Sequence, residues 1–302
     1  MTPHEQVTAL ERALHRVYDR AHRNATAQNR RAIETLAREL EGATPERLQY
    51  LRWNAARTRG LADRLAEEIS RATDTATRMI SGEALNLFHG GYQDAALNFN
   101  RQLRGMGLQT NVNLMNRNTL NAIFNGEHSA LARLPGFQEA FRLLSHPMVF
   151  DRDRARWYYN RAADRLGNDA ELVRRLQNAL GEAIALGEGV AKITRRIHSI
   201  VNETEHRARR IARTETLRAL NQGRYLAGEQ AAREYGLRLT KTWRATADDR
   251  TRDKHEDADG QAADFEKPFI VGGEELMYPL DPNGSAANTV NCRCTMTVRV
   301  KR

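Results

Sequence analysis

The sequence predicts a mainly α-helical protein, with an extended helical body that opens with a long helical hairpin and ends in a small α+β module. Apolar residues recur at intervals of three and four along much of the chain before Gly236. Aromatic residues make up only 6% of the 302 residues, which leaves little for a wide sheet core. Strand-like alternation begins after Gly236. We therefore expect a hairpin over 1–82, a helical body over 83–236 and a module over 237–302.

Two helices are expected in the hairpin. The apolar rhythm runs over 7–40, and Gly42 ends it. Thr44 then stands as an N-cap residue before Pro45, at the first helical position, and the rhythm resumes over 48–79. Helices of this length suit a hairpin that packs against a second copy or another subunit, and an intramolecular bundle explains them equally well.

The body is predicted in pieces. Glycine pairs and frequent asparagines over 83–136 indicate short helices and loops. A basic helix with aromatic residues at 157–159 follows, and further helices start near Asn168 and Gly189. A long helix is expected over 203–235.

One carboxylate interrupts the apolar stripe of that long helix. Glu215 lies among apolar positions, with Arg218 three residues further on and Arg213 nearby. Because an unpaired buried carboxylate costs several kcal/mol, we expect a structural ion pair here.

The module is expected to hold strands over 237–243, 269–271 and 294–300, with a loop or short helix over 248–260. Turn-rich segments separate them.

The positive charge is concentrated ahead of the module. The net charge is +9, and residues 241–302 hold 10 basic and 11 acidic side chains, which leaves 37 and 27 for residues 1–240. All but five of the 47 basic residues are arginine, the better bidentate partner for phosphate. Contact with nucleic acid is one interpretation, and arginine-rich codon usage with solvated helix faces is the other. The candidate contacts are Arg152, Arg154, Arg156, Arg207, Arg209 and Arg210.

Membrane and disulfide classes are disfavoured. No apolar run reaches the ~18 residues of a membrane span, and the first residues do not resemble a signal peptide. We therefore expect a protein made in the cytoplasm, with no membrane partner. Two cysteines separated by one residue make no disulfide framework.

These cysteines are candidate metal ligands. On a strand, Cys292 and Cys294 project to one face, and His255 with a carboxylate such as Asp257 or Asp259 would complete a tetrahedral set. Zinc is the ion this set suits, in a structural rather than a catalytic role. Two buried, reduced thiols are the alternative.

His255 also suggests an enzymatic alternative. Beside Asp253, Asp257 or Asp259 it could act as a general base in a metal-dependent nuclease or hydrolase, with Cys292 and Cys294 as further site residues. A solvated acidic loop explains the same residues. Phosphate-cradling loops, nucleophile elbows and HExxH motifs are absent from the sequence, so we expect no catalytic activity.

The order of motifs from about residue 185 onward resembles the phage Mu F-like minor head proteins, the phage head morphogenesis family. The motifs are Gly189 to Ile193, Ile211 to Thr216, Trp243 with Asp249 to Arg252 and His255, Gly260, Tyr278-Pro279, Asp281-Pro282 and Asn291 to Cys294. The resemblance places the family's characteristic residues on Arg213, Glu215, Trp243, Asp249, Arg250, Arg252, His255, Gly260, Cys292 and Cys294.

The resemblance implies a minor component of a tailed phage or prophage head. Such a protein would lie inside the capsid near the portal, after assembly in the host cytoplasm, and would contribute to head assembly and to packaging or delivery of DNA. Its implied partners are the portal, other head proteins and packaged double-stranded DNA, with self-association through the N-terminal helices. A transient assembly factor that is absent from the finished virion is a further alternative.

Overall fold

A computed structural model of the chain describes residues 2–53, 55–108 and 169–301. These residues form two compact units. One unit comprises residues 9–53, 55–79 and 169–209, and the other comprises residues 2–8, 80–108 and 210–301. Each unit has its own core, and the long helices α4 (Ala55–Gly105) and α10 (Val190–Tyr235) contribute residues to both.

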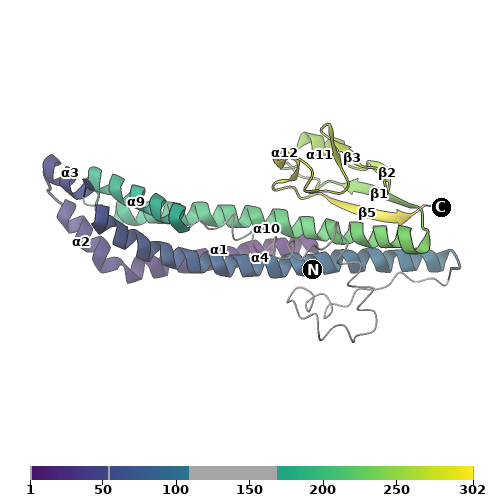
Figure 1. Cartoon of the computed structure of the whole chain (residues 1–302), viewed down its shortest axis with the longest axis horizontal. Coiled ribbons are helices and arrows are strands. Elements are labelled where there is room, and N and C mark those ends of the chain that lie inside the picture. Colours follow the sequence, from purple (N-terminus) through teal and green to yellow (C-terminus); the bar gives the residue numbers. More distant parts are fainter. Residues whose placement is uncertain (1, 54, 109–168, 302) are drawn as a thin grey trace, which may run out of the picture. The chain divides into compact units, whose positions relative to one another are not determined.

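The first unit is entirely helical in the residues that the structure describes. Besides its parts of α4 and α10, it contains most of α1 (Pro3–Gln28) and all of α2 (Arg30–Leu40), α3 (Pro45–Trp53) and α9 (Asp169–Ala185) (Figure 1). The predicted cap is confirmed, because the Arg47 backbone N–H donates to Thr44 Oγ1 at 3.3 Å and α3 begins at Pro45. The predicted stop is confirmed as well, since Gly42 follows α2 with a φ of 68°.

Within this unit the predicted hairpin is antiparallel, but its first arm consists of two helices, α1 and α2, and not of the single helix that was expected. The Tyr18 hydroxyl of α1 lies 3.4 Å from Thr73 Oγ1 of α4, and Arg64 Nε donates to Asn29 Oδ1 at 2.9 Å. From Tyr18 to Asn29, which directly follows α1, the chain advances, while the contacted residue on α4 moves back from Thr73 to Arg64. Two antiparallel helices produce this order of contacts. Burial raises the pKa of Tyr18 to about 12.

A buried carboxylate cluster stabilises the helical unit. Glu205 on α10 is buried and accepts from His15 Nδ1 at 3.0 Å, while Arg209 lies 3.6 Å from the same carboxylate. Arg209 also approaches Glu11 at 3.8 Å. Part of the positive charge of this region is therefore balanced inside the protein.

The prediction of short helices and loops is wrong for residues 83–105, where α4 continues without a break. Its glycines have a packing role. A Cβ at Gly91 would lie 2.3 Å from the Leu220 carbonyl oxygen, and one at Gly223 would lie 2.2 Å from that of Phe88. The two glycines let α4 and α10 approach backbone to backbone in the second unit, which outweighs the low helix propensity of glycine. The rest of the predicted segment, 109–136, and the predicted basic helix lie outside the described residues.

The second unit carries the C-terminal module. Its main sheet has the strand order β2-β1-β5 and is antiparallel, and β3 and β4 form a separate hairpin. The strands are β1 (Leu239–Arg244), β2 (Ala262–Asp264), β3 (Phe269–Val271), β4 (Glu274–Leu276) and β5 (Thr295–Val300), and the short helices are α11 (Asp253–Asp257) and α12 (Ala286–Thr289).

The three predicted strands correspond to β1, β3 and β5, and the predicted mainly helical fold with a small α+β module is confirmed. The elements β2, β4 and α12 were not predicted. Each has three or four residues, too few to show a periodicity. The boundaries at residues 82 and 236 remain a prediction, and α4 passes residue 82 unbroken.

Strand β5 lies along the second half of α10, as Figure 1 shows. Asn221 on α10 donates to the Cys294 carbonyl at 3.0 Å and accepts from the Met296 N–H at 3.1 Å. On the α4 side, Gln102 Oε1 accepts from the Val300 N–H at 2.9 Å. Side chains of both helices thereby satisfy backbone groups of β5, which fixes the segment that contains the cysteines.

None of the helices in the described ranges combines the length and apolarity that a membrane span requires.

Candidate metal centre

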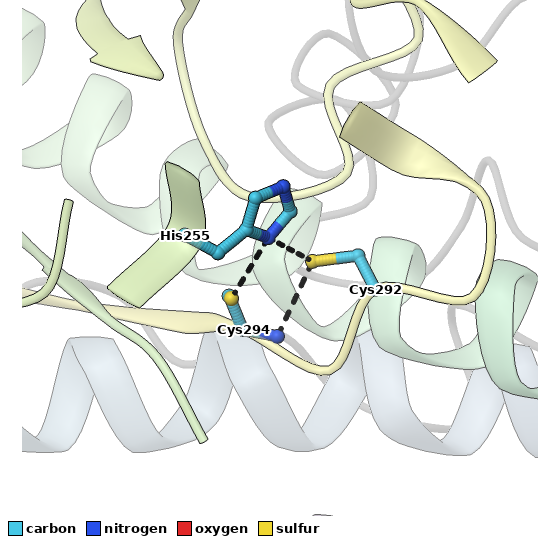
Figure 2. A group of neighbouring side chains, drawn as sticks. All are labelled: His255, Cys292 and Cys294. Atoms are coloured by element: carbon cyan, nitrogen blue, oxygen red, sulfur yellow. Dashed lines mark hydrogen bonds between the residues drawn. The ribbon is translucent and has the colours of Figure 1, made fainter. Parts of the chain in front are cut away.

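Three side chains that were predicted from the sequence converge in the module. His255 comes from α11, and Cys292 and Cys294 come from the segment that leads into β5 (Figure 2). His255 Nδ1 lies 3.3 Å from Cys294 Sγ and 3.5 Å from Cys292 Sγ, and all three atoms lie within 4.8 Å of one another. Figure 2 shows the same ring nitrogen turned toward both sulfurs.

The group is buried. His255 is 1% exposed and each cysteine 2%, and the Cys294 backbone N–H donates to Cys292 Sγ at 3.3 Å. Trp243, on β1, meets the His255 ring edge-on with 5.8 Å between the ring centroids. The second ring nitrogen, Nε2, is buried and has no hydrogen-bond partner in the described part of the chain. These three side chains therefore have almost no direct contact with bulk solvent.

The two thiols titrate as a pair. Hydrogen bonding from Cys292 and from His255 lowers the pKa of Cys294 to about 5, although burial acts in the opposite direction. Hydrogen bonding with Cys294, together with burial, raises the pKa of Cys292 well above its usual value.

The acidic candidates lie apart from this group. Asp253, Asp257 and Asp259 are exposed, and none of them belongs to the cluster. Asp259 Oδ1 instead accepts from the Ala245 N–H at 2.9 Å. The structure thus brings together His255 and both cysteines, but leaves Asp257, the predicted fourth ligand, outside.

Helix α10 holds the loop that precedes the cysteines. Arg213 donates to Asn291 Oδ1, and the Asn291 N–H donates to Thr214 Oγ1 at 2.9 Å. Asn291 has a φ of 62°, a conformation that asparagine tolerates better than most residues. Arg213, a predicted motif residue, therefore positions the backbone immediately before Cys292.

The predicted ion pair within α10 is confirmed. Arg218 Nη1 lies 2.8 Å from a Glu215 oxygen, both side chains are at most 3% exposed, and Arg218 Nε donates to the Leu280 carbonyl at 2.9 Å. Leu280 has a φ of 66°, an unusual conformation for leucine. The buried pair thus also fixes a strained loop of the module.

A second set of motif residues closes the other side of the cysteine segment. Arg293, between the cysteines, forms a bidentate ion pair with Asp248, and this contact lowers the pKa of Asp248. Arg252 donates to the Val290 carbonyl. Asp249 and Arg250 are exposed, and Arg250 Nη2 lies 3.7 Å from Asp248.

Gly260 is also a motif residue with a structural role. It has a φ of 75°, and its N–H donates to the Trp243 carbonyl at 3.1 Å. The motif residues with described contacts therefore act mainly on the backbone of the module.

Sequence reasoning missed several residues of this arrangement. Contacts that hold the cysteine segment or its neighbouring loop are also made by Thr214, Asn221, Asp248, Leu280 and Arg293. Thr214 and Arg293 stand inside the quoted motifs, so their position was the available signal. The sequence around Asn221, Asp248 and Leu280 gave no signal of these contacts, because their partners lie more than 40 residues away along the chain.

The predicted nucleic-acid contacts are only partly described. Arg207 and Arg210 are exposed on α10, whereas Arg209 is engaged with Glu205 and Glu11. Arg152, Arg154 and Arg156 lie outside the described residues.

Comparison with known proteins identifies the region that contains this centre. Residues 174–297 match the family described as Phage Mu protein F like protein. The predicted resemblance is confirmed for this part of the chain.

Two curated proteins are similar in sequence to parts of the chain. Minor head protein GP7 of Bacillus phage SPP1 is 30% identical over 156 residues, which are 51% of this chain and 44% of that protein. The NAD(+)–arginine ADP-ribosyltransferase EFV of Enterococcus faecalis is 34% identical over 125 residues, which are 41% of this chain and 25% of that protein. The chain thus spans less than half the length of either relative. No solved structure matches.

Proposed function

We propose that this protein is a minor head protein of a tailed phage or prophage, and that it takes part in head morphogenesis. The observation that carries the proposal is the match of residues 174–297 to the phage Mu F-like family, together with the similarity to a protein named as a minor head protein. The finer proposal is that it lies inside the head near the portal and contributes to packaging or delivery of DNA.

The architecture is consistent with a docking role. The motif residues make contacts that tie the module together: Arg213 donates to the Asn291 side chain, Glu215 pairs with Arg218, and the Gly260 N–H donates to the Trp243 carbonyl. These contacts build a rigid module on α10. A rigid module can present an invariant surface to a portal or head protein. Self-association through the N-terminal helices is part of the same proposal, since long helices offer extended packing surfaces.

We propose a non-catalytic role. The candidate nuclease site rests on His255, Cys292 and Cys294, which are at most 2% exposed, so a polynucleotide has no direct access to them. The relative named as an ADP-ribosyltransferase motivates a direct test, in which the chain is incubated with NAD⁺ and an arginine-containing acceptor. We expect no transfer of ADP-ribose, and no metal-dependent cleavage of DNA or RNA that His255→Ala abolishes. Either activity would replace this proposal by an enzymatic one.

Contact with DNA is the second part of the proposal. It rests on the positive charge of residues 1–240 and on the exposed Arg207 and Arg210 of α10. The slope of log K against log salt is negative, and each phosphate contact that is lost should reduce its magnitude by about 0.9. R207Q/R210Q should therefore reduce this magnitude by about 2. R174Q is the control, because Arg174 is exposed but is paired with Glu171.

The DNA measurement is a salt titration of duplex binding with the full chain. If R174Q and R207Q/R210Q have the same effect, or if the wild-type chain does not bind duplex DNA at low salt, the DNA part of the proposal is wrong. The head-protein part stands independently of that result.

The test of the head-protein proposal is quantitative mass spectrometry of purified, DNA-filled particles from the phage or prophage that encodes the chain. A few copies per particle support a minor head protein, and their loss on triggered DNA release supports a role in delivery. Presence in assembling heads but absence from finished particles would indicate a transient assembly factor. Absence from both would refute the proposal.

A further inference from the structure

The convergence of His255, Cys292 and Cys294 in a buried site calls for an explanation beyond docking. We propose that these three side chains bind a zinc ion, which joins α11 to the segment that leads into β5. The inference is independent of the role in head morphogenesis.

The two distances from His255 Nδ1 to the sulfurs match the nitrogen–sulfur edges of a zinc tetrahedron. With Zn–N of about 2.0–2.1 Å and Zn–S of about 2.3 Å, a tetrahedral ion has N···S edges of about 3.5 Å. The two distances from His255 Nδ1 to the sulfurs are 3.3 and 3.5 Å, and all three atoms lie within 4.8 Å of one another. One ion can therefore reach all three atoms with small side-chain movements.

The ligand set determines which ion fits. Two thiolates and an imidazole are ligands for zinc and other soft or borderline metals, whereas magnesium and calcium take oxygen ligands. Two thiolates also neutralise a divalent cation, so the loaded site buries no net charge. Both sulfurs approach the same ring nitrogen of His255, which is the arrangement that a shared ion would produce.

The described residues supply three of four ligands. Within the described ranges, no further histidine, cysteine, aspartate or glutamate joins the group. A water molecule would take the fourth tetrahedral position. Because the three ligands are buried and tie secondary-structure elements together, the ion would act in folding rather than in hydrolysis.

The module has a clear need for such a link. Three of its strands have three residues each, and α11 has five. His255 precedes Cys292 by 37 residues, so a shared ion would close a long loop. In small folds a structural metal commonly adds such a link to the stability that the hydrophobic core provides.

The first experiment measures zinc in the full chain, purified under reducing conditions without added metal. We expect about one zinc per chain by elemental mass spectrometry, with the zinc lost in Cys292→Ser, Cys294→Ser and His255→Ala. Asp257→Asn and His206→Ala are matched controls, since both side chains are exposed, and they should retain the ion. Cobalt substitution should give thiolate-to-metal charge-transfer absorption that the cysteine variants lack.

A second measurement keeps the proposal testable if the variants do not fold. Removal of zinc from the folded wild-type chain by a chelator should lower the unfolding temperature of the module by about 10 °C or more. Added Zn²⁺ should restore it, and Mg²⁺ should not.

Two outcomes would overturn the proposal. One is that the reduced wild-type chain binds neither Zn²⁺ nor Co²⁺. The other is that the Cys292→Ser/Cys294→Ser double variant binds zinc with unchanged stoichiometry and affinity.

Discussion

Replacement of Arg218 by methionine tests whether the α10 motif has a structural role in the module. Arg218 and Glu215 are at most 3% exposed, and their closest atoms are 2.8 Å apart. Methionine keeps the unbranched, apolar stem of arginine but removes the charge and the donors. The substitution leaves Glu215 without this buried counter-charge and the Leu280 carbonyl without the Arg218 donor.

The expected loss of stability follows from the burial. Breaking a buried ion pair by removing one partner costs about 3–5 kcal/mol, because an uncompensated charge remains in a medium of low polarity. The Leu280 carbonyl also loses a donor, and a buried acceptor without a partner costs about 1–3 kcal/mol. This cost does not simply add to the first, because the effects of groups that share one side chain are not additive. We therefore expect R218M to destabilise the module by about 3–5 kcal/mol.

The assay is hydrogen exchange of the β5 amides, which reports on the module locally. The control is R174M, because Arg174 forms an ion pair with Glu171 at the same spacing in α9, but both side chains are exposed. Removal of that surface pair should change exchange little. The double variant E215L/R218M should lie closer to wild type than R218M, since it removes both charges of the pair.

Two results would refute the reasoning. An R218M module that loses less than about 1 kcal/mol would show that the pair does not support the Leu280 loop. Equal effects of R218M and R174M on the β5 amides would show that burial does not determine the cost.

Two further tests concern packing and electrostatics in the same unit. Gly91→Ala should destabilise the unit by about 1–3 kcal/mol, because the new Cβ would lie 2.3 Å from a carbonyl oxygen of α10. Gly90→Ala meets nothing within 4 Å and should stabilise α4 by up to about 1 kcal/mol. Thermal unfolding of both variants checks this, and a stability change of the same sign in both would contradict it. Burial lowers the pKa of Lys241 to about 8 from 10.5, so the unfolded chain binds more protons between these values and this residue makes stability rise with pH there. Lys241→Met should lack that rise in urea unfolding, and parallel pH profiles for the two proteins would refute the assignment.

The helical hairpin and the first and last strands of the module could be predicted from the sequence because their signals are local. The apolar rhythm, the Thr44–Pro45 cap and Gly42 define helix ends through contacts between near neighbours. Alternation over six residues likewise marks β1 and β5. The sequence also indicated that Glu215 needs Arg218, because the two residues stand one helical turn apart.

The continuity of α4 could not be predicted, because its cause is nonlocal. Glycine is a poor helix former, and only the approach of α10 shows why Gly91 is retained within a helix.

For the candidate centre, the sequence by itself determined the ligand types, since Cys292 and Cys294 at alternate positions with a histidine upstream suggest a metal. Only the tertiary structure decided which groups meet. It brought His255 Nδ1 to both sulfurs and left Asp257 exposed, because α10 and Asn221 fix the path of the cysteine segment while α11 turns its acidic side chains outward. Spacing along the chain restricts which residues share a face, whereas the packing of distant elements determines which faces touch.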